Sequence, residues 1–385
     1  MNGFRFFAEV GLWTCLAASA GAAGAPQPLV TPNASPEAVA LLNFVYSLSG
    51  RHTLTGQHNF PNTRDESTAR AAKIYGKTPA IFGQDFGFAA AGDKDSVAAR
   101  PAMIAECERQ FARGSLIALC WHAVPPTADE PVTFLPRRGT NAPSRLASVQ
   151  GRLTDDQWRD LLTPGTALYQ HWCAQVDVIA GFLKQLQAAR VPVLWRPYHE
   201  MNGNWFWWGG RPGEHGTAAL YRQLFDRLTH VHHLTHLVWV WSLDRPGANA
   251  GAFADFFPGK AFFDIAALDV YRNDFQKDYY DELLRLADGK PITLAEVGPP
   301  PSLAILEQQP NWSWWMSWAG MGRGTTNEAV RQLFESPRSW SLSDPEYRAA
   351  SAVILKTSGR APPPEENLDG KGGKPGEVPE LLPGF

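Results

Sequence analysis

Cysteine is scarce in this sequence, which also has no long hydrophobic run and no excess of either charge. Only four cysteines occur among 385 residues, and removal of a predicted N-terminal signal leaves Cys107, Cys120 and Cys173. Because three cysteines allow at most one bridge, a framework of several disulfides is excluded. No two cysteines have the C-x-x-C spacing, so we expect no zinc site and no other bound metal.

The balanced charge and the short apolar runs exclude two further classes of protein. The formal net charge is −3, which offers no basic surface of the kind that binds nucleic acid. No later segment reaches the roughly 18 consecutive apolar residues that a membrane-spanning helix needs. The glycine-rich stretch 320–324 lacks the strand and the lysine of a phosphate-binding loop, and we expect no cofactor. We predict a monomer that binds neither nucleic acid nor, after signal cleavage, a membrane.

Both ends of the chain differ in composition from the middle. Residues 1–25 contain a short apolar stretch, 10–20, and end in a small-residue cleavage pattern, which predicts a signal peptide and a secreted protein, extracellular or periplasmic. Residues 361–385 are rich in Pro, Gly, Glu and Lys, which predicts a flexible tail. Residues 26–360 are then expected to form one domain.

Within that domain, short apolar runs alternate with longer stretches of helical periodicity. The helical stretches include 36–47, 96–112, 166–189 and 217–234, and the proline-rich stretch 123–164 is predicted to be a long connection that could line a cleft. Eight apolar runs are predicted to be strands: 52–55, 80–83, 116–121, 191–198, 237–241, 265–270, 292–295 and 312–318. Eight strands separated by helices over about 300 residues favour an α/β fold of the (β/α)8 TIM barrel type over an open doubly wound sheet.

Polar or aromatic residues stand at the end of nearly every predicted strand. In a barrel, the carboxyl ends of the strands converge on one face, where functional groups gather. The residues at these ends are His58, Asp85, His122, His199, Glu200, Asp244, Tyr271, Glu296 and Trp318.

Aromatic residues are the compositional outlier, with 15 Trp and 21 Phe, and they are dense in the segment WRPYHEMNGNWFWWGG at 195–210. Glu200 stands among Trp205 and four more aromatic residues, Trp195, Phe206, Trp207 and Trp208. Aromatic rings stack on the apolar faces of sugar rings, and a carboxyl group can protonate a glycosidic oxygen. The alternative is a buried aromatic cluster with one exposed glutamate.

Glu296 is the second carboxyl candidate, because it closes the apolar run 291–295 and precedes a turn signal. A structural salt bridge to Arg196 is the alternative role for Glu296. The same arginine would also hold Glu296 ionised and nucleophilic, and Tyr271 could donate a hydrogen bond to it. Glu200 would need a raised pKa, which burial beside Trp205 and repulsion from Glu296 would provide.

These motifs resemble glycoside hydrolase family 26, whose best-known members are β-mannanases. The resemblance rests on R-P-x-H-E followed by N-G-x-W-F-W-W-G, on L-D-V-Y, on L-A-E-V-G and on the early T-G-Q-H, and it spans roughly residues 36–340. It implies a (β/α)8 barrel, retention of configuration, Glu200 as acid/base and Glu296 as nucleophile. The residues implied to bind substrate or line the site are His122, Arg196, His199, Trp205, Asp269, Tyr271 and Trp318, with Trp314 and Trp315 as alternatives to Trp318.

The resemblance implies a secreted endo-β-1,4-mannanase that acts on mannan, glucomannan or galactomannan. Two alternatives stay open at this point: hydrolysis of another β-glycan, such as xylan or mixed-linkage glucan, and sugar binding by a non-catalytic barrel. A protein that only binds sugar has no use for two opposed carboxyl groups, which favours the enzyme.

Overall fold

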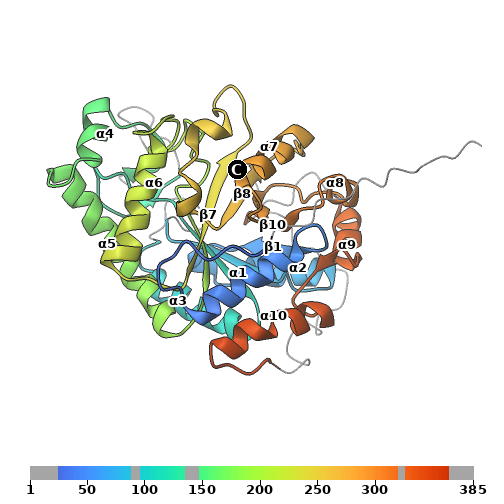
Figure 1. Ribbon diagram of the computed structural model, residues 1–385. Coiled ribbons are helices and arrows are strands. Elements are labelled where there is room, and N and C mark those ends of the chain that lie inside the picture. Colours follow the sequence, from blue (N-terminus) through green and yellow to red (C-terminus); the bar gives the residue numbers. More distant parts are fainter. Residues whose placement is uncertain (1–24, 88–95, 135–146, 320–325, 364–385) are drawn as a thin grey trace, which may run out of the picture.

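Eight parallel strands form a closed barrel, which confirms the predicted fold (Figure 1). The structure is a computed structural model that describes residues 25–87, 96–134, 147–319 and 326–363. Each strand pairs with the next, and the last pairs with the first, in the order β1-β2-β3-β6-β7-β8-β9-β10-β1. The eight strands are β1 Thr53–His58, β2 Ile81–Asp85, β3 Leu116–Trp121, β6 Val193–Pro197, β7 Leu237–Asp244, β8 Ile265–Val270, β9 Ile292–Val297 and β10 Trp312–Ser317.

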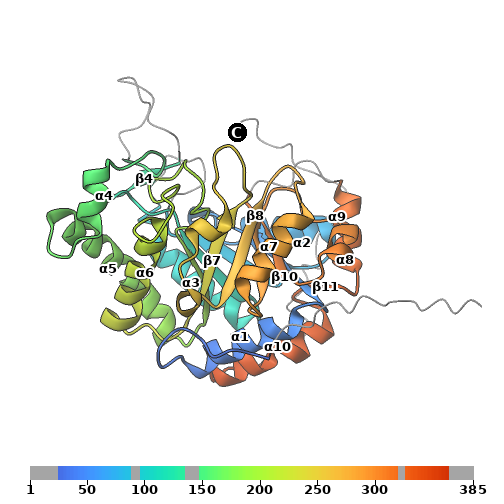
Figure 2. The same ribbon diagram turned by 45° about the horizontal axis from the view of Figure 1, so that its top comes forward.

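Helices surround the barrel on its outer side (Figure 2). Several begin where their sequence provides a cap: the Thr154 hydroxyl accepts from the Gln157 N–H in a capping box, and Thr166 caps the longest helix. The α-helices are α1 Pro36–Leu48, α2 Glu66–Tyr75, α3 Arg100–Ala112, α4 Asp155–Leu161, α5 Ala167–Ala188, α6 Thr217–Asp226, α7 Lys277–Ala287, α8 Leu303–Gln308, α9 Asn327–Glu335 and α10 Pro345–Thr357.

All eight predicted strands are present, with boundaries that shift by a few residues. Several features of the described residues were not predicted, and one of them is helix α4, which lies inside the stretch 123–164 that was predicted to be a connection. A short strand, β11 (Ser339–Trp340), pairs with the first two residues of β1. The two-residue strands β4 (Val132–Thr133) and β5 (Ala147–Ser148) pair with each other in the long connection after β3. The predicted helix 217–234 ends at Asp226 and continues as one turn of π-helix, Arg227–Val231.

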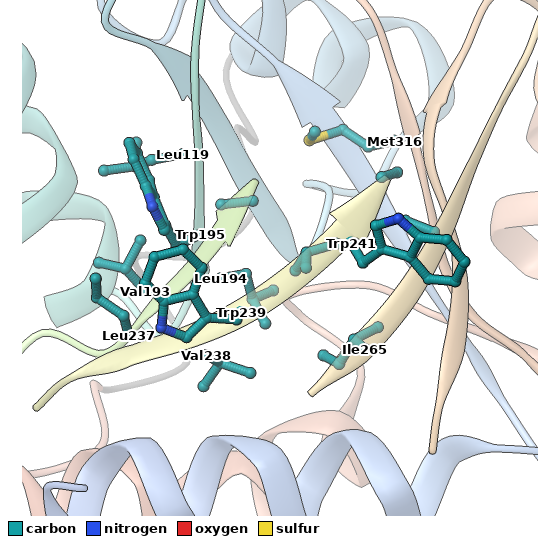
Figure 3. Close-up of a cluster of buried hydrophobic side chains, with 14 of the residues drawn as sticks. Leu119, Val193, Leu194, Trp195, Leu237, Val238, Trp239, Trp241, Ile265 and Met316 are labelled. Carbon is teal, nitrogen blue, oxygen red and sulfur yellow. The ribbon is translucent and has the colours of Figure 1, made fainter. Parts of the chain in front are cut away.

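The strands are buried on both faces, because side chains alternate between the barrel interior and the helical layer. Trp195 and Trp239 are register partners on β6 and β7, and both are fully buried among aliphatic side chains (Figure 3). Leu194 and Arg196, one position away, line an interior cavity of only about 10 Å³, which has room for about one water molecule. The barrel is therefore a packed core, and its chemistry must lie at the strand ends.

The predictions about the cysteines, a membrane-spanning helix and the two ends of the chain have different outcomes. Cys107, Cys120 and Cys173 are free thiols, and all three are buried. Among the described residues, no helix has both the length and the apolar character needed to cross a membrane. The predicted signal peptide and the predicted flexible tail fall almost entirely on residues 1–24 and 364–385, outside the described part of the chain.

Candidate active site

Two glutamates and an aspartate meet at the carboxyl end of the barrel. Glu200 follows β6, while Asp269 and Glu296 are the second-last residues of β8 and β9. Carboxylate oxygens of all three lie within 4.8 Å of one another, and all three residues are buried. The sequence separates Glu200 from Glu296 by almost a hundred residues, and closure of the barrel brings them together.

The backbone after β6 turns sharply and aims the Glu200 side chain at the barrel mouth. Tyr198 and Glu200 both have positive φ, at 47° and 50°, which costs a residue with a Cβ roughly 1–2 kcal/mol. Asn202 secures this turn: its Nδ2 donates to the Asp244 carbonyl at 2.7 Å, and its Oδ1 accepts from the Asp244 N–H at 2.8 Å. Such strain persists at functional sites because the surrounding contacts fix the conformation.

Glu200 lies in surroundings that favour its protonated form. The residue is only 8% exposed, and burial raises the pKa of its carboxyl group well above the usual value, with a further contribution from the charge of Glu296. The indole Nε1 of Trp205 donates to Glu200 Oε2 at 2.6 Å and acts in the opposite direction. The net effect is a raised pKa, which favours the protonated form that a general acid needs.

Two neighbouring side chains donate hydrogen bonds to the carboxyl group of Glu296. Arg196 Nη2 donates to Glu296 Oε2 at 2.7 Å, and the Tyr271 hydroxyl donates to the other oxygen, Oε1. The second arm of Arg196 donates to Asp269 at 2.6 Å and to Ser242 at 3.3 Å. The salt bridge considered as an alternative role for Glu296 is thus present. The paired carboxyl group still lies next to Glu200 and Asp269, so the salt bridge and a role at the site are compatible.

Two histidines lie beside these carboxyl groups. His122 receives two contacts from Asp85: its Nδ1 lies 2.7 Å from one carboxylate oxygen, and its backbone N–H donates to the other at 3.0 Å. The His122 and His199 rings are edge to face, 4.4 Å between centroids. Burial, aided by the charge of Arg196, lowers the pKa of His199 well below its usual value, so this imidazole is neutral at ordinary pH.

Trp318 lies at the end of β10 and forms a flat surface next to the histidines. It stacks on the ring of His58 at 3.7 Å and lies 5.8 Å from the ring of His122. Burial lowers the pKa of His58 to about 3, so the ring beneath the indole is uncharged. Trp314 and Trp315 are fully buried within β10, which leaves Trp318 as the tryptophan of this strand at the barrel mouth.

The predicted wall of five aromatic residues around Glu200 is wrong for Trp195. That side chain belongs to β6 and points to the helical layer, where it contacts Phe86, because residues 195 and 196 alternate across the strand. Trp207 and Trp208 are also fully buried and donate to the backbone carbonyls of Ala123 and His199. Of the five residues, Trp205 is the one that contacts the Glu200 carboxyl group.

Some residues of the site were not predicted as such. Asp85 was noticed only as a strand end, and its carboxylate orients His122. Ser242 donates to Asp269 at 3.2 Å, and nothing in its local sequence indicates this. Asn202 belongs to the N-G pair of the motif that resembles the family. Its hydrogen bond to Asp244, the last residue of β7, arises only when the chain folds.

In the part of the chain that the structure describes, two clusters have the donor types that metal ions use. One consists of Asp85, Cys120 and His122, and the other of the three carboxyl groups described above. In the first, Asp85 already contacts His122, and in the second, Arg196 contacts two of the carboxylates. The expectation that the protein needs no metal stays a prediction.

A sequence comparison with protein families matches residues 30–344 to Glycosyl hydrolase family 26. Among curated proteins, the mannan endo-1,4-beta-mannosidase of Thermothelomyces thermophilus is 31% identical over 304 residues, covering 75% of this chain and 56% of that protein. The mannan endo-1,4-beta-mannosidase of Bacillus subtilis is 28% identical over 342 residues, covering 82% of this chain and 87% of that protein. The chain thus spans a little over half of the first relative and most of the second.

Solved structures have the same fold. GH26A from Muricauda sp. superposes with a TM-score of 0.74 and 38% identity, covering 81% of this chain and 98% of that one. The Podospora anserina GH26-CBM35 beta-(1,4)-mannanase gives a TM-score of 0.68 and 28% identity, covering 85% of this chain and 72% of that one.

Proposed function

Because the chain belongs to glycosyl hydrolase family 26, we propose that it is a retaining endo-β-1,4-mannanase in which Glu200 and Glu296 are the catalytic pair. The observation that carries the proposal is the position of these two carboxyl groups, whose oxygens lie within 4.8 Å of each other. Retaining glycosidases place their carboxyl groups roughly 5–5.5 Å apart, whereas inverting enzymes leave roughly 6.5–9.5 Å for a water molecule.

In the first step of the proposed reaction, a carboxylate oxygen of Glu296 attacks the anomeric carbon. The bond between that carbon and the glycosidic oxygen breaks, and Glu200 delivers its proton to the departing oxygen. The result is an ester between Glu296 and the sugar. Arg196 and Tyr271 support this step, because their hydrogen bonds fix the orientation of the Glu296 carboxyl group.

In the second step, the Glu200 carboxylate takes a proton from a water molecule, and the resulting oxygen attacks the anomeric carbon. The ester bond breaks, the sugar leaves with its original configuration, and both glutamates return to their starting protonation states. His122 and His199 are proposed to hold sugar hydroxyls, and Trp318 to stack beneath the sugar ring. The neutral state of His199 suits hydrogen bonding to a hydroxyl group.

The choice of mannan as substrate is supported by the relatives, since both curated proteins described above are named for that activity. The catalytic pair itself would serve xylan or mixed-linkage glucan equally well. Selectivity between these polymers depends on contacts around the 2-hydroxyl group, whose orientation distinguishes mannose from glucose.

The first experiment compares hydrolysis of β-mannan, xylan and mixed-linkage glucan under one set of conditions, with products resolved by size over time. We expect mannan to be degraded fastest and long oligosaccharides to appear first, as endo cleavage requires. Preferential turnover of xylan or glucan would reject the substrate, and mannobiose or mannose as the sole early product would reject the endo mode.

The roles of the two glutamates are tested with matched alanine variants. Glu296→Ala removes the nucleophile, and we expect turnover to vanish on both mannan and activated aryl mannosides. Glu200→Ala should still form the ester from substrates with good leaving groups, and added azide should restore its breakdown. Near-normal activity of Glu296→Ala, or an equal loss on all leaving groups in Glu200→Ala, would contradict the assignment.

Secretion and a monomeric state are also proposed. The composition of residues 1–25 supports export, and N-terminal sequencing of protein recovered from outside the cytoplasm would test it. A single species near the mass of one chain in analytical ultracentrifugation is the expected result for the oligomeric state.

A further inference from the structure

One exposed aromatic ring lies beside the catalytic centre without any role in the mechanism above. Phe134 directly follows β4 in the long connection after β3, and it is 40% exposed. Single exposed apolar side chains are common on protein surfaces, so exposure alone carries little weight. The position of this ring is what distinguishes it.

The Phe134 ring packs on residues of the proposed sugar site. Its centroid lies 6.4 Å from the His122 ring at an angle of 82°, and 6.3 Å from the Phe206 ring at 70°. Both partners are themselves edge to face with His199, at 4.4 and 5.3 Å. Phe206 and His122 are each only 3% exposed. Phe134 is therefore the outermost ring of a cluster whose inner members surround the catalytic centre.

The backbone that leads to Phe134 is fixed at two points. Thr133, its neighbour, pairs with Ser148 in the β4–β5 ladder, and the Thr133 carbonyl accepts from the Val149 N–H at 3.0 Å. The residues after β5 bond to the turn that carries Trp205. The Trp207 N–H donates to the Val149 carbonyl at 3.1 Å, and the Gly151 N–H donates to the Trp205 carbonyl at 3.1 Å.

A second anchor lies before β4. Glu130 forms an ion pair with Arg100, a fully buried residue whose guanidinium also donates to the Phe86 carbonyl. Buried charges of this kind are retained where their geometry fixes a neighbouring segment. The segment that leads to Phe134 is thus held at the catalytic face at both of these points.

We propose that Phe134 is a sugar-binding residue that stacks on a substrate ring beyond the one at the catalytic centre, so that β4 and the residue that follows it form part of one wall of the cleft. An exposed phenyl ring held against the site offers the flat apolar face that pyranose rings use. This inference rests on the proposed function, since it assumes that a polysaccharide lies across the catalytic pair.

The test compares two substrates that differ in how much of the cleft they occupy: mannohexaose and a 2,4-dinitrophenyl β-mannoside with one sugar ring. For Phe134→Ala, we expect the ratio of kcat/KM on mannohexaose to kcat/KM on the aryl mannoside to fall roughly tenfold, as loss of one aromatic contact predicts. Phe134→Tyr keeps the flat ring and should recover most of this ratio.

Val353→Ala is the matched control, because Val353 is a similarly exposed apolar residue on α10, 47% exposed and far from the strand ends. It should leave the ratio unchanged. An unchanged ratio in Phe134→Ala would overturn the proposal. An equal loss of kcat/KM on both substrates would also overturn it, because it would show that the ring only supports His122. Failure of the wild-type protein to cleave mannohexaose would instead overturn the proposed function.

Discussion

Arg196 holds two carboxylates at once, and this makes it the residue on which the charge arrangement depends. One arm contacts Glu296 and the other contacts Asp269, and all three side chains are buried. Removing one partner of a buried ion pair leaves the other charges uncompensated, which is far more costly than never having had the pair. Catalysis and stability therefore depend on the same side chain.

We expect Arg196→Met to lower the free energy of unfolding by about 3–5 kcal/mol and to abolish measurable turnover. Urea denaturation and kcat/KM on mannan are the measurements. Arg159→Met, which breaks the exposed pair with Asp156, is the control and should change stability by less than about 1 kcal/mol. A similar small change for Arg196→Met would mean that the pair is not energetically important.

The pH dependence of activity follows from Glu200. In the proposed reaction Glu200 must be protonated, so we expect kcat/KM to fall as pH rises through its raised pKa. The Trp205 N–H stabilises the charged form, and its removal in Trp205→Phe should raise this pKa further. We therefore expect the alkaline limb of the pH profile to move to higher pH. Movement to lower pH would show that the indole acts mainly through burial.

At the residue scale, site residues that directly follow a predicted strand could be identified from the sequence. Residues whose contacts come from other strands could not. Glu200 and Glu296 could be identified because each ends an apolar run. Ser242 could not, because its contact with Asp269 depends on the register of β7 and β8. Trp195 was misplaced because the motif letters do not show on which side of β6 a residue lies.

At the level of elements, the turn between β6 and α6 positions Glu200 through close packing around its glycines. A Cβ at Gly203 would lie 2.2 Å from the far ring edge of Trp205, so an alanine must displace the indole from Glu200. Gly247, in the neighbouring connection after β7, has nothing within 4 Å of a corresponding Cβ. The two glycines therefore provide a matched pair.

Gly203→Ala should lower kcat/KM by roughly 10- to 100-fold, since displacements near 1 Å at a catalytic group have effects of that order. Gly247→Ala should behave like the wild type. Steady-state kinetics on mannan measures both, and a circular dichroism melt shows whether the fold persists. Equal activity of the two variants would show that Trp205 can move without consequence.

The barrel strands and the longest helices could be predicted from periodicity, because nearly all residues of the barrel strands are buried and a long helix such as α5 buries residues that recur along one side. The connection after β3 could not. Its two strands contain two residues each, which is too short for a pattern, and the residues after β5 bond to the distant turn that carries Trp205. Tertiary contacts, rather than local sequence, specify that segment.

At the scale of the whole molecule, the ring of strands and the last helix stabilise the same core. Helix α10 lies along α1 beneath the barrel, as Figures 1 and 2 both show, and it buries Tyr347, Ile354 and Leu355. Each such side chain contributes roughly 1.5–3 kcal/mol, and their sum is comparable with the roughly 5–15 kcal/mol stability of a typical protein.

Two truncations test this assignment. A chain ending at Pro363 keeps every described contact of α10, including the Arg348 hydrogen bond to the Pro363 carbonyl, and should match the full chain in Tm and kcat/KM. A chain ending at Leu342 lacks α10 and should fail to give a cooperative thermal transition. A cooperative melt of the shorter chain within a few degrees of the longer one would contradict the role given to α10.

The pairing of β10 with β1 has a consequence for how activity arises during folding. Leu54 and Thr55 near the start of the chain pair with Trp314 and Trp315 near its end, so the ring cannot close until nearly the whole polypeptide is available. Contacts so distant along the chain form late and slowly. An incomplete chain emerging from the ribosome would hold Glu200 without Glu296 opposite it. Cleavage of substrate should therefore begin abruptly, with the arrival of the last strands, rather than growing gradually as the chain lengthens.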